Sequence, residues 1–287
     1  MTITRSLGSS PTTSPDAAAS SPPDTAASSP EWVDPLRAVI FDVDGTLADT
    51  ERDGHRVAFN EAFAAAGLDY RWGVQEYGEL LTLTGGRRRI TRYLESRGHC
   101  AAEAAALAAE LHQDKTRRFA ALVRAGAIQA RPGAAELISA LRAEGVATAV
   151  ATTGTEDCVL PLLDTLFGLD AFDVVVTGSE VTDLKPDPAV YREAMARLQV
   201  SPSGAVAVED SANGVQAAVA AELRCVAVVN GYTRDQDLSG AVAVLDDLTR
   251  PEGVGVLRGD PELREGLSVA ALRRLMTAPS TDPPGSG

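Results

Sequence analysis

Two aspartates, Asp42 and Asp44, stand two positions apart, directly after the apolar run Ala38–Phe41 and before Gly45. Four consecutive apolar residues are typical of a strand that is buried on both faces, as in a parallel sheet. Open parallel sheets bind ligands beyond the carboxyl ends of their strands, which is where this pair falls. Two adjacent carboxylates repel unless a cation or a shared proton lies between them. The pair therefore predicts a site for a metal or for proton transfer, and a plain Asp-Gly turn is the alternative.

Polar side chains also follow three later predicted strands. In strand order they are Thr152 and Thr153, then Lys185, then Glu209 and Asp210. Each has an ordinary explanation when taken alone, such as a surface turn for Lys-Pro or a helix N-terminal charge for Glu-Asp. Because strand ends in this kind of sheet face one crevice, their occurrence in order at successive strands predicts a single site.

This set of side chains suits phosphoryl transfer. A carboxylate such as Asp42 can attack phosphorus and form an aspartyl-phosphate, which splits one difficult displacement into two easier ones. Mg²⁺ prefers carboxylate oxygens and cancels the repulsion between a carboxylate and a phosphate dianion. Lys185 and Thr152 can hold the oxygens of the transferred group. Asp44 can protonate the leaving oxygen and later take a proton from water.

The elements that must position these groups alternate along the chain. Strands are expected at residues 38–41, 146–151, 172–176, 205–208, 225–229 and 241–245, with helices between them from residue 132 onward. Such alternation implies right-handed crossovers and a parallel sheet with helices on both faces. The segment between the first two strands follows a helical pattern broken by glycines. We therefore expect an α/β fold, a doubly wound parallel sheet with a Rossmann-like core, and a helical cap inserted after the first strand.

The same pattern divides the chain into four parts. In chain order these are a disordered tail (1–34), the α/β core (35–50 and 128–249), the helical cap (51–127) and a largely disordered C-terminal extension (250–287). The tail is dominated by Ser, Pro, Thr and Ala, which offer little to bury. In the extension, residues 269–276 are expected to form one short helix after a capping serine.

The composition narrows the class of partner. Of 287 residues, 40 are acidic and 26 basic, and this net charge of −14 disfavours binding to nucleic acid or an anionic membrane. Cys100, Cys158 and Cys225 are odd in number and widely spaced, so we expect buried thiols in a reducing compartment. No apolar run approaches the roughly 20 residues of a membrane helix. The tail lacks a signal-peptide core, and its acidic residues disfavour the alternative of a transit peptide. We therefore expect a cytoplasmic monomer that binds a small molecule.

Four motifs of this sequence resemble those of the haloacid dehalogenase superfamily. They are Asp-Val-Asp-Gly-Thr at 42–46, Thr152, Lys185-Pro186 and Glu209-Asp210. The resemblance covers about residues 36–249. A helical cap between the first and second motifs resembles the branch that contains β-phosphoglucomutases and small sugar-phosphate phosphatases. Haloacid dehalogenation itself is not expected, because that chemistry lacks the second aspartate.

The superfamily resemblance implies a role for each motif residue. Asp42 would be the nucleophile and Asp44 the general acid/base, while Thr152 and Lys185 would grip the phosphoryl group. It also implies bound Mg²⁺. The implied ligands are the Asp42 carboxylate, the backbone carbonyl of Asp44, Asp210, and Glu209 either directly or through water.

The cap carries a second basic site at residues 84–89, Thr-Gly-Gly-Arg-Arg-Arg. Two glycines before a helix expose backbone N–H groups at its positive end, which favours an anion. Arginines add bidentate phosphate donors. The site predicts a substrate with a second phosphate, and a solvated helix face pairing with Glu95 and Glu103 is the alternative. The expected substrate-binding residues here are Thr84, Gly85, Gly86, Arg87 and Arg88, joined by Thr153 from the core.

The stretches 45–51, 57–60 and 80–87 resemble the CbbY-type phosphatases. Members of that group hydrolyse xylulose-1,5-bisphosphate, which inhibits the carbon-fixing enzyme of the Calvin cycle. By this resemblance Glu51 would contact substrate hydroxyls and Tyr77 would line the same pocket. His112 and Lys115 are weaker candidates, since such residues on one helix usually face solvent.

One position departs from this pattern. Gly54 lies inside the first expected cap helix, where glycine costs about 1 kcal/mol relative to alanine, and it leaves open whether His55 faces the pocket. The function expected from the sequence is an Mg²⁺-dependent sugar-phosphate phosphatase acting through an aspartyl-phosphate. The first alternative is a β-phosphoglucomutase-like phosphomutase with the same aspartates. A non-catalytic binding protein is the second alternative, and it predicts a lost motif, whereas all four are present.

Overall fold

The computed structural model of the chain describes residues 36–249 and 252–277. The predicted tail at 1–34 lies outside these residues. The described strands form one sheet in the order β3-β2-β1-β4-β5-β6-β7. Its strands are β1 (Ala38–Phe41), β2 (Ala147–Ala151), β3 (Val174–Val176), β4 (Ala205–Glu209), β5 (Arg224–Val228), β6 (Ala243–Leu245) and β7 (Val256–Arg258). The first six run parallel and β7 is antiparallel to β6. The predicted doubly wound parallel sheet is confirmed.

Helices cover both faces of the sheet, so the side chains of a strand, which point alternately to opposite faces, are buried in two separate layers. In β1, Val39 and Phe41 join one hydrophobic cluster, whereas Ala38 and Ile40 join a second. The first cluster also takes in side chains of α5 (Ala134–Ala143), α6 (Glu156–Leu166) and α9 (Val269–Thr277), and the second those of α7 (Ala189–Leu198) and α8 (Ala212–Ala220). Short 3₁₀ turns lie at Leu169–Ala171 (η2), Pro202–Gly204 (η3) and Pro261–Glu265 (η4).

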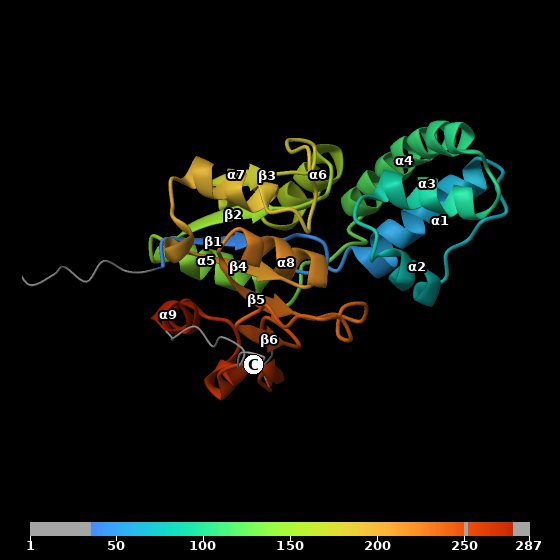
Figure 1. Ribbon diagram of the computed structural model, residues 1–287. Coiled ribbons are helices and arrows are strands. Elements are labelled where there is room, and N and C mark those ends of the chain that lie inside the picture. The colour runs from blue at the N-terminus through green and yellow to red at the C-terminus, as the bar shows by residue number, and fades with distance from the viewer. Residues whose placement is uncertain (1–35, 250–251, 278–287) are drawn as a thin grey trace, which may run out of the picture. The chain divides into compact units, whose positions relative to one another are not determined.

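The chain between β1 and α5 is helical, as expected for a cap inserted after the first strand. It contains a π-helical turn η1 (Glu51–His55), α1 (Arg56–Ala65), α2 (Val74–Leu80), α3 (Gly86–Ser96) and α4 (Ala101–Arg124). The cap has a hydrophobic cluster of its own, rich in aromatic side chains such as Phe63 and Trp72. Figure 1 shows α1–α4 gathered together at one end of the sheet. This separate cluster lets the cap hold its shape while it faces the strand ends.

Two chain segments join the cap to the core, and they lie side by side. Ala48 of the first segment bridges Ala130 of the second, and the Arg131 backbone N–H donates to the Leu47 carbonyl at 2.9 Å. The Arg131 guanidinium is buried in the core. Its acceptors are the carbonyls of Gly45, Val228, Val229 and Asp246 and the Asp247 carboxylate. One guanidinium thus fixes the segment that carries Asp44 to the ends of β5 and β6.

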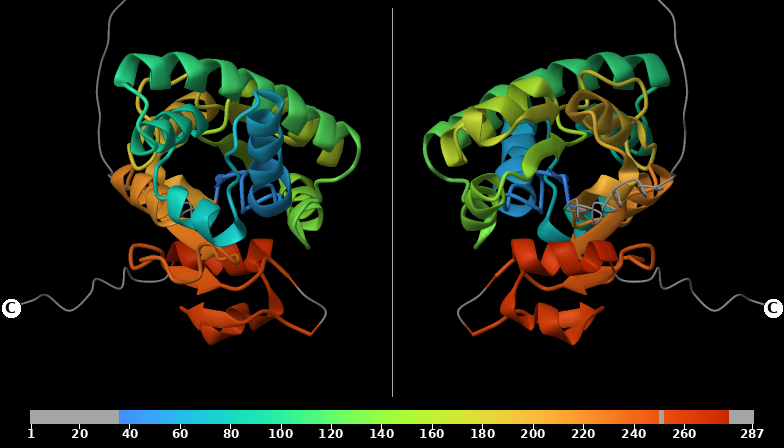
Figure 2. Two further views of the ribbon diagram at one scale, coloured as in Figure 1. Left: turned by 90° about the vertical axis from the view of Figure 1, so that its right-hand side faces the viewer. Right: turned by 90° about the vertical axis from the view of Figure 1, so that its left-hand side faces the viewer.

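The C-terminal extension is more ordered than predicted. The prediction of a largely disordered extension is wrong for residues 252–268, which contain β7 and η4. The reason is that β7 pairs with β6, while Val254, Leu263 and Leu267 bury their side chains in the first core cluster. Arg224 also donates to the Leu275 carbonyl at 2.8 Å. Figure 2 shows these elements, in orange to red, together at one edge of the core.

The short helix predicted at 269–276 is present as α9. None of the helices in the described part of the chain is long and apolar enough to span a membrane.

Candidate active site

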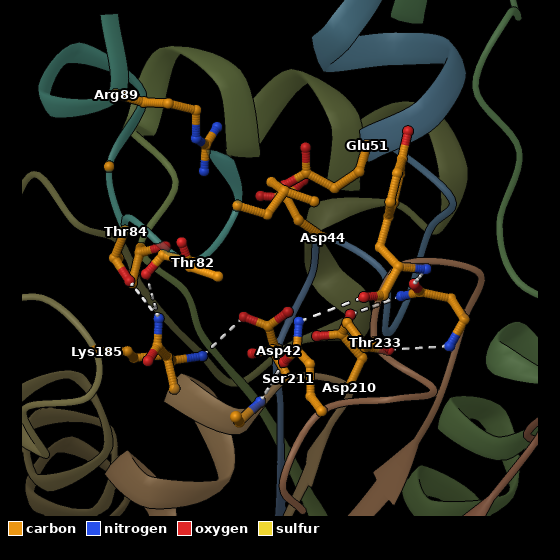
Figure 3. Close-up of a pocket in the computed structure, with 18 of the residues that line it drawn as sticks. Asp42, Asp44, Glu51, Thr82, Thr84, Arg89, Lys185, Asp210, Ser211 and Thr233 are labelled. Carbon is orange, nitrogen blue, oxygen red and sulfur yellow. Dashed lines mark hydrogen bonds and ion pairs between the residues drawn. The ribbon is translucent and has the colours of Figure 1, made fainter. Parts of the chain in front are cut away.

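A buried ion-pair network lies at the carboxyl ends of β1 and β4. The Lys185 ammonium donates to Asp42 Oδ1 at 2.7 Å, to Glu209 Oε1 at 2.6 Å and to the Ala151 carbonyl at 2.7 Å. Lys185 is 4% exposed and Glu209 is fully buried. Figure 3 shows Lys185 and Asp42 directed toward each other across the floor of a cavity. The structure therefore brings together three of the residues predicted from separate strand ends.

Glu209 is held by more donors than Lys185 alone. The Tyr191 hydroxyl of α7 donates to Glu209 Oε1 at 2.6 Å, and the Asp210 backbone N–H to Oε2 at 3.2 Å. The Lys185 ammonium also lies 4.9 Å from the centre of the Tyr191 ring. Gly214, in the first turn of α8, leaves the space that the Glu209 carboxylate fills, since a Cβ there would overlap it. Nothing in the sequence pattern indicated Tyr191 or Gly214.

The Asp210 carboxylate is oriented by a residue that follows a fifth strand, β5. The Asn230 side-chain amide, just after β5, donates to Asp210 Oδ2 at 2.6 Å. Gly45 approaches the same carboxylate so closely that a side chain would clash, and its φ of +93° also favours glycine. The rule of strand ends, applied to β5, also points to Asn230.

The carboxylates Asp42, Glu209 and Asp210 form a group that fits a metal ion. One oxygen from each lies within 4.8 Å of the others. Burial, opposed by Lys185 and reinforced by Glu209 and Asp44, raises the pKa of Asp42 to about 8. Burial and the charges of Asp42 and Glu209 also raise the pKa of Asp210 well above its ordinary value. Three buried carboxylates face one ammonium, so a divalent cation that prefers oxygen ligands matches both the charge and the donors.

Asp44 sits in a different electrostatic environment from Asp42. The Thr50 hydroxyl donates to Asp44 Oδ1 at 2.6 Å, and His55 Nε2 lies 3.0 Å from the same oxygen. Burial alone would raise the pKa of Asp44, but the charge and hydrogen bond of His55, with that of Thr50, hold it well below its ordinary value. Gly54 permits this arrangement, because a Cβ there would lie 2.7 Å from Ile128 Cδ1. The question left open by the sequence is answered, since His55 faces Asp44.

The two threonines after β2 take different positions. Thr152 is 1% exposed, and its hydroxyl oxygen accepts a hydrogen bond from the Gly154 backbone N–H at 3.0 Å. Thr153 lines the cavity above Asp42. The predicted grip of Thr152 on a phosphoryl group remains a prediction, and the structure shows this hydroxyl shaping the loop that presents Thr153.

The cavity above Asp42 has a volume of about 270 Å³ and is lined by residues of both the core and the cap. Asp42, Lys185 and Asp210 lie at its base, while Thr84, Gly85 and Arg89 approach from the cap. Figure 3 shows Glu51 and Asp44 between these two groups. The core residues Asn213, Tyr232 and Thr233 also line it. Sequence reasoning missed these three, which follow β4 and β5.

Tyr77 is fully buried and does not line this cavity. Its hydroxyl donates to the Glu51 carboxylate, so it orients a cavity residue from behind. Arg89 reinforces this arrangement. Its guanidinium donates to the carbonyls of Leu80 at 3.0 Å and Leu83 at 3.2 Å, and lies 3.4 Å from the Tyr77 hydroxyl. Tyr77 and Arg89 therefore fix the walls of the cavity, whereas Glu51 faces into it.

A second, basic cavity of about 200 Å³ shares Asp44, Glu51 and Thr153 with the first. The predicted cap residues Gly85, Gly86, Arg87 and Arg88 line it together with Arg89, His112 and Lys115. The ammonium of Lys115 lies 4.9 Å from the Phe59 ring centre and 5.1 Å from that of Phe119. Burial, followed by the charges of Lys115 and His55, lowers the pKa of His112 to about 4. This end of the site thus concentrates positive charge around neutral His112.

Arg87 and Arg88 are exposed, and neither forms an ion pair in the part of the chain that the structure describes. Glu95, their expected partner, pairs with Arg92 at 3.2 Å, and Glu103 accepts from the Cys100 backbone N–H. The alternative of a self-compensated helix face therefore does not describe these two arginines. Their charges remain available to an anion in the basic cavity.

Comparisons with known proteins show what the whole chain is similar to. A family model described as a haloacid dehalogenase-like hydrolase matches residues 36–222. Protein CbbY of Cereibacter sphaeroides is 46% identical over 226 residues, which cover 77% of this chain and 96% of that protein. The crystal structure of CbbY from Rhodobacter sphaeroides in complex with phosphate matches with a TM-score of 0.69 at 46% identity, covering 74% of this chain and 94% of that chain. A mutant of that protein in complex with xylulose-(1,5)bisphosphate gives the same values.

Proposed function

We propose, from the premise that this chain belongs to the haloacid dehalogenase-like hydrolases and within them to the CbbY-like proteins, that it hydrolyses a sugar bisphosphate. The resemblance read from its motifs is confirmed, and the protein is a sugar phosphatase. Xylulose-1,5-bisphosphate is the best candidate substrate, since a similar protein binds it. The observation that carries the proposal is a pair of adjoining cavities. One has the carboxylate–lysine pair at its base, and the other is lined by Arg87 and Arg88, which form no ion pair within residues 36–249 and 252–277.

The first step uses Asp42 as the nucleophile. A carboxylate oxygen of Asp42 attacks phosphorus, the bond from phosphorus to the sugar oxygen breaks, and an aspartyl-phosphate forms. Lys185, fixed to Asp42 and Glu209, holds a phosphoryl oxygen as negative charge develops. Asp44 gives its proton to the leaving sugar oxygen. In the second step Asp44 takes a proton from water, the water oxygen attacks phosphorus, and inorganic phosphate leaves as Asp42 is regenerated.

The protonation of Asp44 follows from its surroundings. Without substrate, Thr50 and His55 favour the carboxylate form, which is the base needed for the second step. A phosphate dianion bound next to Asp44 adds negative charge and raises its pKa, which favours the acid needed for the first step. The same group can thus serve both steps in turn.

Mg²⁺ is the cation proposed for the acidic group. Asp42, Asp210 and the Asp44 backbone carbonyl would hold it, with Glu209 acting through water, because Lys185 and Tyr191 already occupy Glu209 Oε1. When bound, the ion supplies positive charge that offsets the repulsion between Asp42 and the phosphate.

The cap supplies the part of the site that selects the substrate. We propose that Gly85, Gly86, Arg87 and Arg88 bind the second phosphate, since they line the basic cavity. Glu51, held by Tyr77, faces the sugar hydroxyls between the two phosphates. The Thr84 hydroxyl contacts the core instead, because it lies 3.0 Å from the side-chain nitrogen of Asn213.

A screen of phosphate release tests this proposal. The purified protein with Mg²⁺ should release inorganic phosphate from sugar bisphosphates, most rapidly from xylulose-1,5-bisphosphate, and release should stop on chelation and return with Mg²⁺. Sugar monophosphates serve as the matched comparison. Conversion of a sugar phosphate to an isomer without phosphate release would contradict the phosphatase and favour the phosphomutase.

We also propose that the protein works as a monomer in the cytoplasm. The three thiols are free, which supports a reducing compartment. Cys158 and Cys225 are buried as predicted, whereas Cys100 is exposed, so the prediction of a buried thiol is wrong there. The molar mass measured by light scattering tests the monomer, and fractionation of the source cells tests the compartment.

A further inference from the structure

Asn213 lies on the core, at the second residue of α8, and reaches across to the cap. Its side-chain nitrogen donates to the Thr82 carbonyl at 3.3 Å and lies 3.0 Å from the Thr84 hydroxyl oxygen. Figure 3 shows Thr82 and Thr84 converging on one nitrogen in the same corner of the cavity. A carbonyl oxygen only accepts, so the amide of Asn213 must turn its nitrogen toward the cap.

We infer that Asn213 is a positioning residue, which fixes cap loop 82–86 relative to the reaction centre and thereby sets the affinity for the second phosphate. This inference rests on the proposed function, because it takes Gly85 and Gly86 as part of the anion site. It adds a residue that belongs to none of the four sequence motifs.

The loop is held from two sides. Within the cap, Arg89 donates to the Leu80 and Leu83 carbonyls and so holds the start of the loop. From the core, the two contacts of Asn213 are the side-chain hydrogen bonds that reach residues 82–86 in the described chain. Without Asn213, the loop keeps its shape within the cap but loses its fixed distance to the core.

Asn213 is itself well anchored beside the reaction centre. It lies three residues after Asp210, and the Ser211 side chain accepts a hydrogen bond from the Gly214 backbone N–H at 3.2 Å. The Ala212 N–H donates to Gln236 at 2.8 Å. The amide of Asn213 is thus rigidly placed relative to Asp210. It therefore sets the separation between the base of the cavity and the glycine turn, and the carbon chain of a bisphosphate limits the separations that it can span.

The test replaces Asn213 and measures kinetics with two kinds of substrate. N213A should raise KM for the bisphosphate about tenfold, since two hydrogen bonds are lost, and change kcat less than threefold. KM for a sugar monophosphate should change less than threefold, because it does not need the glycine turn. Q216A, an exposed change on the same helix, should leave every value unchanged.

A double-mutant cycle isolates the contact itself. T84V removes the hydroxyl that faces Asn213 and should raise KM by about threefold, since one hydrogen bond is lost. Combined with N213A it should add no further increase, because the second change removes a contact already gone. Fully additive effects would overturn the contact, and an equal rise of KM for mono- and bisphosphate would overturn the link to the second phosphate.

Hydrogen exchange separates this inference from the proposed function. In the protein without substrate, backbone amides of residues 82–86 should exchange about tenfold faster in N213A than in Q216A, since local opening costs less. Faster exchange in N213A would support the positioning role even if no bisphosphate is hydrolysed. In that case only the proposed function would fail. Unchanged exchange in 82–86 would overturn the positioning role.

Discussion

The reaction centre in the core and the basic cavity of the cap differ in whether their charged side chains are paired within the protein. Lys185 is 4% exposed and neutralised by Asp42 and Glu209, within hydrogen-bond distance of both. Arg87 and Arg88 are exposed and, within the described residues, have no ion pair. A charge network completed inside the protein is fixed before substrate arrives, which suits one reaction. Uncompensated cap charges depend on the ligand, so the core determines the reaction and the cap selects the substrate.

The largest expected effect falls on the core nucleophile. D42N should lower kcat for phosphate release by at least about a thousandfold, because an amide does not attack phosphorus. The amide keeps the shape of the side chain, so the protein should remain folded by circular dichroism. D49N, an exposed aspartate on the same segment, is the matched control and should retain full activity. Comparable activity in D42N and the control would refute the mechanism.

The next prediction compares the unfolding free energy that is lost when one cation is removed from the core and one from the cap. K185M removes the partner of two buried carboxylates and should cost about 3–5 kcal/mol of unfolding free energy. R88A removes an exposed cation and should change it by less than about 0.5 kcal/mol. Without Lys185, the folded-state pKa of Asp42 rises further above its unfolded value, so the remaining stability should fall as pH rises.

Urea unfolding at pH 6 and pH 8 measures both variants. An equal loss of stability in K185M and R88A would show that the contrast between buried and exposed charges does not exist.

Much of the reaction centre could be predicted because a parallel sheet brings neighbouring strand ends together. Asp42, Lys185 and Glu209 are distant in sequence, yet each follows or ends a strand, and a rule about strand ends needs no side-chain detail. Asn230 obeys the same rule at β5. The superfamily followed from the motifs and the fold from the alternation of strands and helices, and both are confirmed.

The remaining site residues depend on the direction in which a side chain points, and a pattern of residue types does not specify that direction. Tyr191 lies on a helix among other apolar residues, and only packing shows its hydroxyl reaching Glu209. Tyr77 was expected in the pocket but supports Glu51 from behind. In the C-terminal extension, composition suggested disorder, whereas the helical spacing of Leu272 and Leu275 was the better guide.

The third effect tests the cap charges directly. R87A and R88A should each raise KM for a bisphosphate by about tenfold or more, since each removes a charge-assisted phosphate contact. KM for a monophosphate should change less than threefold. Arg92 lies on the same helix but is paired with Glu95. R92A therefore serves as the control and should leave both KM values unchanged. Equal effects on mono- and bisphosphates would remove the second-phosphate site.

The smallest effect concerns His112, which the cap holds neutral beside Lys115. Its pKa is lowered to about 4 by burial and then by nearby positive charge. The unfolded chain, with a histidine pKa near 6.5, therefore binds a proton between pH 6.5 and 4 that the folded protein does not. Stability should fall as pH drops through this window, by on the order of 1–2 kcal/mol at pH 5.

Urea unfolding between pH 5 and 7.5 measures how the unfolding free energy changes with pH. H112Q should remove the part of this change that comes from His112, whereas H99Q should leave that part in place. Bound phosphate sharpens the comparison of the two regions. An anion in the basic cavity offsets the positive charge that, together with burial, lowers the pKa of His112. This pKa should therefore rise, and the slope assigned to His112 should become shallower with phosphate present. In D42N, which leaves the cap unchanged, the same flattening is expected. If phosphate left the His112 slope unchanged, the cap charges would not be acting on an anion in that cavity.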